Sequence, residues 1–431
     1  MPENFHIDMP EAVRNIIHTI EEHGFKAYAV GGCIRDSILG RNPDDWDITT
    51  SAVPSQIKTF FKRTVDTGIA HGTVTIMIDK TGYEVTTYRI DGEYEDGRHP
   101  KSVEFSDRLV DDLCRRDFTI NAMAYNDTDG FVDEFKGLDD LDTKIIRCVG
   151  EPELRFTEDA LRMMRAIRFS AQLGFTIDEA TWNAIKKLSP SISKISMERV
   201  HVELGKTLMS AHPDYVAQYS EAGLFAPILP VIDNALKSRY KRKILATLQH
   251  TPDNIYLRYA ALFITSTPDE AAKTLRALKL DNKTVNTVSK LVELSKMDIE
   301  ETEPAVRTAL NKYGRDFLPL WHELMMAVIQ ASEDITGISN PAKVKHLLTL
   351  KRLGTDILAR GDCFTIKDLD ISGNDLIEYG LQGHEIGKTL KSLLDIVIEN
   401  PKLNDKATLI AMIEHCLLYT SDAADDLIGV D

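Results

Sequence analysis

The chain has little cysteine, no long apolar run and no repeat, and these absences exclude several classes of protein. Only five cysteines occur among 431 residues, and none forms a Cys-x-x-Cys pair, so the sequence predicts neither a zinc site nor a disulfide framework. No run approaches the roughly 18 apolar residues of a membrane span. Residues 1–25 lack the basic start and apolar centre of a signal peptide. We therefore expect a cytoplasmic protein that does not bind a membrane.

Positive charge is scarce overall but concentrated locally. The formal net charge is −16, which is unusual for a protein that binds RNA. However, residues 155–209 contain nine Lys/Arg against six Asp/Glu, and further basic clusters occur at residues 237–243 and 343–352. The alternative for any one cluster is a solvated helix face. Three clusters on an acidic background favour a track for an RNA backbone.

The pattern of apolar residues divides the chain into two regions. A chain of 431 residues is too long for one ordinary core, so about two to four domains are expected. Short apolar segments separated by Gly, Asp and Pro predict strands early in the chain. From about residue 155, apolar residues recur at helical spacing. The prediction is an α+β domain, a mixed sheet flanked by helices, followed by an all-helical part. The expected strands cover residues 27–30, 45–49, 74–78 and 84–88.

Residues 28–52 carry the clearest chemical signal. An apolar run leads into Gly31-Gly32, where backbone N–H groups could approach a phosphate. If residues 45–49 form a strand, Asp45 and Asp47 project from the same face, which suits Mg²⁺. Each feature alone is commonly a tight turn or a solvated turn. Together they predict a triphosphate cradle beside a divalent metal ion, which is the chemistry of nucleotidyl transfer.

In this order and spacing, the segment resembles the DNA polymerase beta-type nucleotidyltransferase superfamily. The form GG-x-x-RD-x-x-LG followed by DD-x-D is similar to the class II CCA-adding tRNA nucleotidyltransferase and bacterial poly(A) polymerase family, in its Gram-positive CCA-adding form. The resemblance implies that Asp45 and Asp47 are catalytic and hold Mg²⁺. It adds Glu84 as a third catalytic carboxylate, and it implies that the triphosphate is bound by Gly31, Gly32 and Arg35.

Two further segments carry nucleotide-binding residues in that family. Residues 115–122 resemble its RRDFT-x-NA motif, which implies that Arg116 binds phosphate while Asp117 and Asn121 bind the sugar. An Arg–Asp ion pair at a helix start is the alternative.

Residues 156–169 resemble the EDxxR motif, in which Asp and Arg act as a protein template for the incoming base. Arg would donate to O2 and N3 of cytosine, and Asp would accept from its amino group. The alternative is a charged helix face with local ion pairs. The helix is expected to be capped by Thr157, and the resemblance assigns nucleotide binding here to Asp159, Arg162, Arg165 and Arg168.

The resemblance also implies a domain division. It predicts a catalytic head at residues 1–150, a helical neck with the templating motif at 151–215, a helical body at 216–340 and a tail that binds tRNA at 341–416. Residues 417–431 are expected to be disordered, and a cloning or sequence-assembly scar is one explanation for them. A polar, Gly-rich loop that follows Arg89 argues for an enzyme able to add the terminal A.

The predicted function is template-independent addition of CCA to the 3′ end of tRNA, using CTP, ATP and Mg²⁺ and releasing pyrophosphate. An A-adding enzyme or a poly(A) polymerase is the nearest alternative. A non-catalytic RNA- or nucleotide-binding relative and a nucleotidyltransferase for small molecules also stay open. The expected tRNA contacts are the acceptor stem and the elbow, and a homodimer is an open alternative to a monomer.

Overall fold

The computed structural model describes residues 6–92 and 103–414, which form two compact units. The first unit comprises Met1–Lys241 with Thr274–Leu280, and the second comprises Arg242–Lys273 with Asp281–Asp431. The predicted tail at 417–431 and most of the predicted loop after Arg89 lie outside the described residues. Within the described ranges, no helix is long and apolar enough to cross a membrane.

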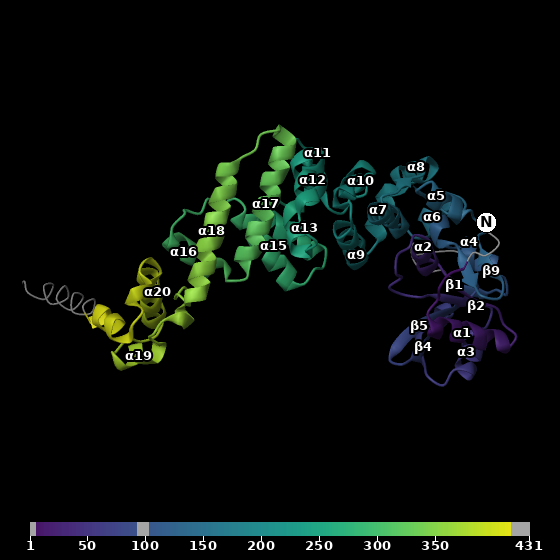
Figure 1. Cartoon of the computed structure of the whole chain (residues 1–431), viewed down its shortest axis with the longest axis horizontal. Helices are drawn as coiled ribbons and strands as arrows, with labels where there is room; N and C mark the ends of the chain where they lie inside the picture. The colour runs from purple at the N-terminus through teal and green to yellow at the C-terminus, as the bar shows by residue number, and fades with distance from the viewer. Residues whose placement is uncertain (1–5, 93–102, 415–431) are drawn as a thin grey trace, which may run out of the picture. The chain divides into compact units, whose positions relative to one another are not determined.

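A seven-stranded sheet organises the beginning of the first unit (Figure 1). The strand order is β3-β4-β5-β2-β1-β8-β9. Strands β2 and β5 are parallel and the other neighbours are antiparallel, so the predicted mixed sheet is confirmed. The strands are β1 Ala27–Val30, β2 Ile48–Thr50, β3 Thr64–Gly68, β4 Thr73–Ile78, β5 Thr81–Thr87, β8 Ala124–Asn126 and β9 Gly130–Val132.

Four short strands form two small ladders outside this sheet. Strand β6 (Arg89–Asp91) pairs antiparallel with β7 (Val103–Phe105). Strand β10 (Ile145–Ile146) pairs in parallel with β11 (Thr176–Ile177), which ties the end of the sheet region to the helices that follow it.

One predicted strand is wrong in a way that matters for the site. The predicted strand at residues 45–49 is only β2, which begins at Ile48, so Asp45 and Asp47 precede it. The reason is the length of the neighbouring strand. The neighbouring strand is β1, and the last hydrogen bond between it and the chain before β2 joins the Val30 N–H to the Asp47 carbonyl at 3.0 Å. Strand β1 ends at Val30, and the φ of 85° at the next residue, Gly31, turns the chain away.

Helices flank the sheet and fill the rest of both units, as predicted. Several begin with proline in the first turn, where its missing N–H costs nothing. The helices of the first unit are α1 Glu11–Glu22, α2 Gly32–Ile38, α3 Pro54–Phe60, α4 Leu109–Cys114, α5 Gly137–Asp142, α6 Pro152–Glu158, α7 Leu161–Leu173, α8 Glu179–Leu188, α9 Met197–Leu208, α10 Val216–Glu221 and α11 Pro230–Lys237.

The second unit contains the longest described helices, α17 and α18, which pack against each other. They are joined by a left-handed Gly337 and by Asn340, whose side chain caps α18. The remaining helices carry apolar residues toward a shared interior. From α12 on, the helices are α12 Lys241–His250, α13 Ile255–Leu262, α14 Pro268–Ala277, α15 Asn282–Leu294, α16 Glu303–Tyr313, α17 Phe317–Thr336, α18 Pro341–Arg360, α19 Gly373–Glu378 and α20 His384–Glu399.

Close packing at Gly137 positions a short 3-10 helix, η2 (Thr119–Asn121), that carries one predicted site residue. Helix α5 packs against η2, and a Cβ atom at Gly137 would lie 2.4 Å from the backbone oxygen of Thr119. Because a backbone oxygen cannot rotate away, only glycine allows this approach.

We therefore expect Gly137→Ala to destabilise the first unit by about 1–3 kcal/mol through overpacking. Thermal unfolding followed by circular dichroism should show a midpoint lower by roughly 2–4 °C per kcal/mol. Gly387→Ala is the matched control, because this glycine is exposed in α20 and its added Cβ would meet nothing within 4 Å. That control should not lower the midpoint. A Gly137→Ala protein that melts like the wild type would contradict the packing argument.

Candidate active site

The glycine turn between β1 and α2 lies directly against an arginine. Gly31 has a φ of 85°, a left-handed conformation that favours glycine. A Cβ atom there would lie 2.8 Å from Nη1 of Arg116. Nε of Arg116 is buried and has no hydrogen-bond partner among the described residues. The structure thus brings two predicted phosphate-binding groups together, and one of them has a donor to spare.

The three predicted carboxylates gather beside this turn. Strands β2 and β5 pair in parallel with Ile48 opposite Val85. Asp47 and Glu84 therefore precede paired positions on neighbouring strands, which are about 4.8 Å apart, and project from the same face. All three carboxylates, including Asp45, belong to exposed residues. The sheet register thus brings Asp47 beside Glu84, whereas the predicted strand at 45–49 was expected to align Asp45 with Asp47.

Burial and neighbouring charges change the pKa values of two of these carboxyl groups. Partial burial and the charge of Asp45 raise the pKa of Asp47, against the opposing charge of Arg116. Partial burial and then the charges of Asp47 and Asp45 raise the pKa of Glu84. Such a group of carboxylates is stabilised by a bound cation.

The donor set fits a divalent cation that is shared with a substrate. Among the described residues, no three His, Cys, Asp or Glu side chains converge closely enough to enclose a metal ion. Mg²⁺ does not need a site formed by protein ligands alone, because in nucleotide-binding proteins it is bound by one or two carboxylates, by water and by phosphate oxygens. Asp45 and Asp47 could supply the protein ligands.

The predicted sugar-binding residues form one connected network. Asp117 accepts a hydrogen bond from Nδ2 of Asn121 at 3.1 Å. Asn121 in turn accepts from Nη1 of Arg35 at 2.7 Å, and Arg35 also binds both carboxylate oxygens of Asp36. Residues assigned to the sugar and to the triphosphate therefore hold each other. Asp117 also pairs with Nη2 of Arg165 at 2.6 Å, an arginine that lies outside this segment, on α7.

Asp117 stays ionised although it is buried. Burial alone would raise the pKa of its carboxyl group, but the charge of Arg165 and the hydrogen bonds from Asn121 and Arg165 outweigh this and lower the pKa below its usual value. The same balance holds for Asp112, where Arg115 and Arg116 outweigh burial.

The predicted template residues lie at a break between two helices. The prediction that Thr157 caps a single helix is wrong, since Thr157 lies inside α6 and donates to the Glu153 carbonyl. Helix α6 ends at Glu158, Asp159 is extended with a φ of −143°, and α7 starts at Leu161. The reason is local, because the Asp159 carboxylate accepts from the Leu161 N–H at 3.0 Å and begins the second helix itself.

Both template side chains already have partners. Asp159 accepts from Nη2 of Arg199 at 2.6 Å. Arg162 donates to the Glu158 carboxylate and, at 3.0 Å, to the Arg115 carbonyl.

The sequence analysis missed two residues that contact the predicted nucleotide-binding arginines Arg165 and Arg168. Glu203 on α9 binds Nε of Arg168 at 2.5 Å and lies 3.9 Å from Nη1 of Arg165. Phe169 lies beneath the same arginines. The spacing of Glu203, four residues after Arg199 and hence on the same helical face, was an available signal.

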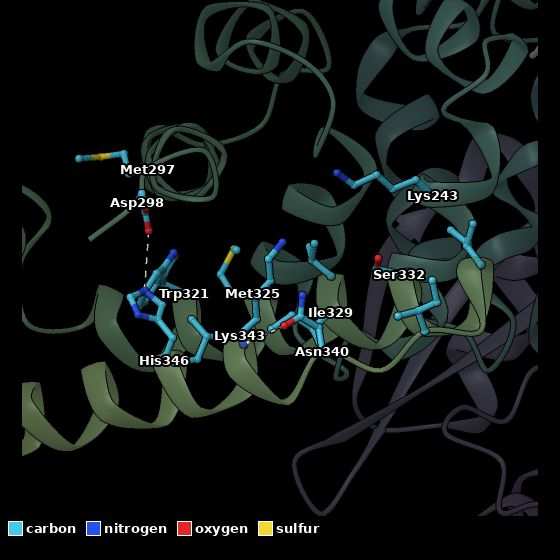
Figure 2. A pocket seen from close by; sticks show the side chains of 14 residues that line it. Lys243, Met297, Asp298, Trp321, Met325, Ile329, Ser332, Asn340, Lys343 and His346 are labelled. Carbon is cyan, nitrogen blue, oxygen red and sulfur yellow. Dashed lines mark hydrogen bonds and ion pairs between the residues drawn. The ribbon is translucent and has the colours of Figure 1, made fainter. Parts of the chain in front are cut away.

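A cavity in the second unit is a different kind of site. It encloses about 560 Å³ between α12, α17 and α18 (Figure 2). Apolar side chains such as Trp321 and Met325 line it, together with Lys243, Lys343 and a single carboxylate from Asp298. One carboxylate cannot replace the group of three beside the glycine turn. We therefore place the candidate active site in the first unit.

Three family models match successive parts of the chain. The model described as "Poly A polymerase head domain" matches residues 27–147. The model "Probable RNA and SrmB- binding site of polymerase A" matches residues 174–236, and "tRNA nucleotidyltransferase domain 2 putative" matches residues 256–413.

Individual relatives match nearly end to end. The CCA-adding enzyme of Pediococcus pentosaceus is 34% identical over 95% of this chain and 98% of its own length. That of Limosilactobacillus fermentum is 37% identical over 93% and 95%. The crystal structure of the Bacillus stearothermophilus CCA-adding enzyme in complex with CTP superposes with a TM-score of 0.74 at 30% identity, covering 96% of this chain and 98% of the other. With sequence and fold in agreement over almost its whole length, the chain belongs to the family of CCA-adding enzymes.

Proposed function

We propose that this chain adds the CCA sequence to the 3′ end of tRNA from CTP and ATP, without a nucleic-acid template. The observation that carries the proposal is the position of Asp45, Asp47 and Glu84 beside the Gly31–Arg116 contact. The relatives named for this activity match the chain nearly end to end, and one solved relative is a complex with CTP.

The reaction is an in-line attack of the tRNA 3′-hydroxyl on the α-phosphate, with release of pyrophosphate. Asp45 and Asp47 would hold Mg²⁺, which lowers the pKa of the attacking hydroxyl and neutralises charge on the leaving group. Glu84 lies close enough to share this acidic face. Arg116 supports the triphosphate role because its buried Nε–H is still available to an acceptor. Gly31, Gly32 and Arg35 complete the proposed triphosphate site.

The proposed sugar and base roles fit the hydrogen-bonded network around Asp117. Asp117 and Asn121 are already fixed by Arg165 and Arg35, so their remaining acceptor capacity can be directed at a ribose hydroxyl. Asp159 and Arg162 supply an acceptor and donors for the base edge, and Arg165 and Arg168 position them. Uracil and guanine present the opposite polarity at one atom, which leaves a buried group unpaired at a cost of roughly 1–3 kcal/mol.

The helical regions are proposed to bind the tRNA. The division into head (1–150), neck (151–215), body (216–340) and tail (341–416) accompanies this proposal, with the acceptor stem near the catalytic residues and the elbow at the tail. Its support is the basic sequence on α18, where Lys343, Lys345 and Lys351 are exposed. Exposed Ile377 and Tyr379 in the tail add apolar surface. A cytoplasmic location and a homodimer stay predictions.

The first prediction from the proposed function concerns the reaction itself. Purified protein with Mg²⁺ should extend a tRNA transcript that lacks CCA by three nucleotides when CTP and ATP are both present, and by two with CTP alone. Products are sized on a gel. Asp47→Asn should lower the rate by at least about 100-fold, since it removes a proposed metal ligand. Addition only to a CC-ended transcript would indicate an A-adding enzyme, and long A ladders would indicate a poly(A) polymerase.

The second prediction concerns the metal and needs no activity. The pKa values of Asp47 and Glu84 are raised in the folded state, so their stabilising effect is lost as pH rises through those values, and at pH 7 they destabilise the fold. An excess of Mg²⁺ that binds the folded state should raise the melting midpoint by roughly 3–8 °C.

In Asp47→Asn this shift should largely vanish, while the metal-free midpoint should be slightly higher than in the wild type. Asp139→Asn is the matched control, because Asp139 is an exposed carboxylate on α5. It should keep the full Mg²⁺ shift. An undiminished shift in Asp47→Asn would remove Asp47 from the metal site.

The third prediction concerns base choice. Arg162→Ala should lower the preference for CTP over UTP, measured as a ratio of kcat/KM values, by roughly tenfold or more, because the donors to the base edge are lost. The Mg²⁺ shift of the melting midpoint should stay unchanged. Lys187→Ala, which removes an exposed cation paired with Glu153, serves as the control and should keep full discrimination. If Arg162→Ala discriminates as well as Lys187→Ala, the template assignment is wrong.

A further inference from the structure

One buried phenyl ring lies against three arginines that serve different parts of the proposed site. Phe169 on α7 is only 5% exposed. The guanidinium carbons of Arg168, Arg35 and Arg165 lie 3.8, 5.0 and 5.3 Å from the centre of its ring. A second ring, Phe118, packs edge-on at 5.8 Å. Cations over an aromatic face are attracted to its negative quadrupole.

Three cations around one ring would repel each other if they were not neutralised. Each guanidinium here has its own carboxylate, so the cluster is balanced. The pairs are Arg35 with Asp36 at 2.8 Å, Arg165 with Asp117 at 2.6 Å and Arg168 with Glu203 at 2.5 Å. The ring is thus the apolar centre of a neutral, hydrogen-bonded shell, and each arginine is held from both sides.

The arginines come from separate segments of the first unit. Arg35 lies on α2, four residues after the Gly31 turn that is proposed to hold the triphosphate. Arg165 lies on α7, three residues after Arg162 and therefore on the same side of the helix as the base template. Phe169 follows Arg165 by four residues on that helix. The ring contacts both the triphosphate side and the base side of the site.

We propose that Phe169 is a positioning residue that fixes the spacing between the triphosphate turn and the base-reading helix. This inference rests on the proposed function and adds a specificity role for a residue that touches no substrate. A nucleotide has a fixed distance between its base and its α-phosphate. If the two parts of the site drift apart, a nucleotide cannot satisfy the base edge and the in-line geometry together. Small misplacements of this kind cost up to about 100-fold in rate.

The proposal predicts an effect on whole nucleotides rather than on their parts. In Phe169→Leu, apolar bulk stays but the aromatic face is lost. Affinity for CTP, measured by calorimetry, should fall roughly tenfold, which is the scale of one desolvated cation–π contact. Affinity for inorganic tripolyphosphate, which does not span the two parts, should change little. The preference for CTP over UTP in kcat/KM should fall as well.

Two further variants separate positioning from general packing. Phe169→Tyr keeps the aromatic face and should restore CTP affinity and discrimination. Phe175→Leu is the matched control, because Phe175 is also 5% exposed and its ring meets no guanidinium among the contacts of the described residues. It should lower the melting midpoint about as much as Phe169→Leu but leave CTP affinity unchanged. If Phe169→Leu does not fold, the comparison of Phe169→Met with Phe169→Tyr replaces it.

The proposal is overturned if Phe169→Leu binds CTP and rejects UTP as the wild type does. It is also overturned if Phe175→Leu shows the same loss, or if tripolyphosphate and CTP affinities fall together. Failure of the proposed function gives a different result, namely no tRNA extension by the wild type. In that case the CTP and tripolyphosphate titrations still decide the role of Phe169.

Discussion

The candidate site depends on one ion pair, between the buried carboxylate of Asp117 and the half-buried Arg165. Asp117 is 8% exposed, and burial alone would disfavour its charge. Arg165 reverses this and keeps the pKa of Asp117 low. Breaking such a pair from one side leaves an uncompensated charge in the interior, which costs several kcal/mol. Because Asp117 follows the sheet-flanking α4 and Arg165 belongs to α7, this cost fixes α7 against the sheet region of the first unit.

The charged residues of the rest of the site divide into a basic half and an acidic half. The basic half is satisfied internally, since Arg35, Arg165 and Arg168 each bind a carboxylate. In the acidic half, burial and the charge of Asp45 raise the pKa of Asp47 against the opposing charge of Arg116, and burial with the charges of Asp47 and Asp45 raises the pKa of Glu84. Rigid donors can fix the nucleotide without reorganisation. Under the proposed function, the acidic half would instead gain stability when a cation and phosphates bind, which would couple metal and nucleotide binding through charge.

The sequence predicted the mixed sheet, the helical remainder and the segments of the site, but not their finer geometry. Strand β1 was predicted to the residue because its four apolar residues are bounded by charge and glycine. Strand β2 was misplaced because its start depends on where β1 ends, which is a tertiary property. The helix break at Asp159 was missed because it depends on a hydrogen bond from the Leu161 N–H to the Asp159 carboxylate, which the spacing of apolar residues does not show. Glu203 and Phe169 were missed because their contacts join distant parts of the sequence. Glu203 pairs with Arg168 on another helix, and Phe169 contacts Arg35, which lies 134 residues earlier in the chain.

The partners of the template residues suggest how the site rejects wrong bases. Asp159 is bound by Arg199 and Arg162 by Glu158, so each of these charged groups has a partner within the protein. A base that offers an amino donor and a ring acceptor can exchange these contacts for equivalent ones at little net cost. A base of opposite polarity at one atom breaks a charged hydrogen bond and replaces it with nothing. Specificity is a difference between affinities, so under the proposed base-reading role these internal ion pairs would set the threshold that a base must match.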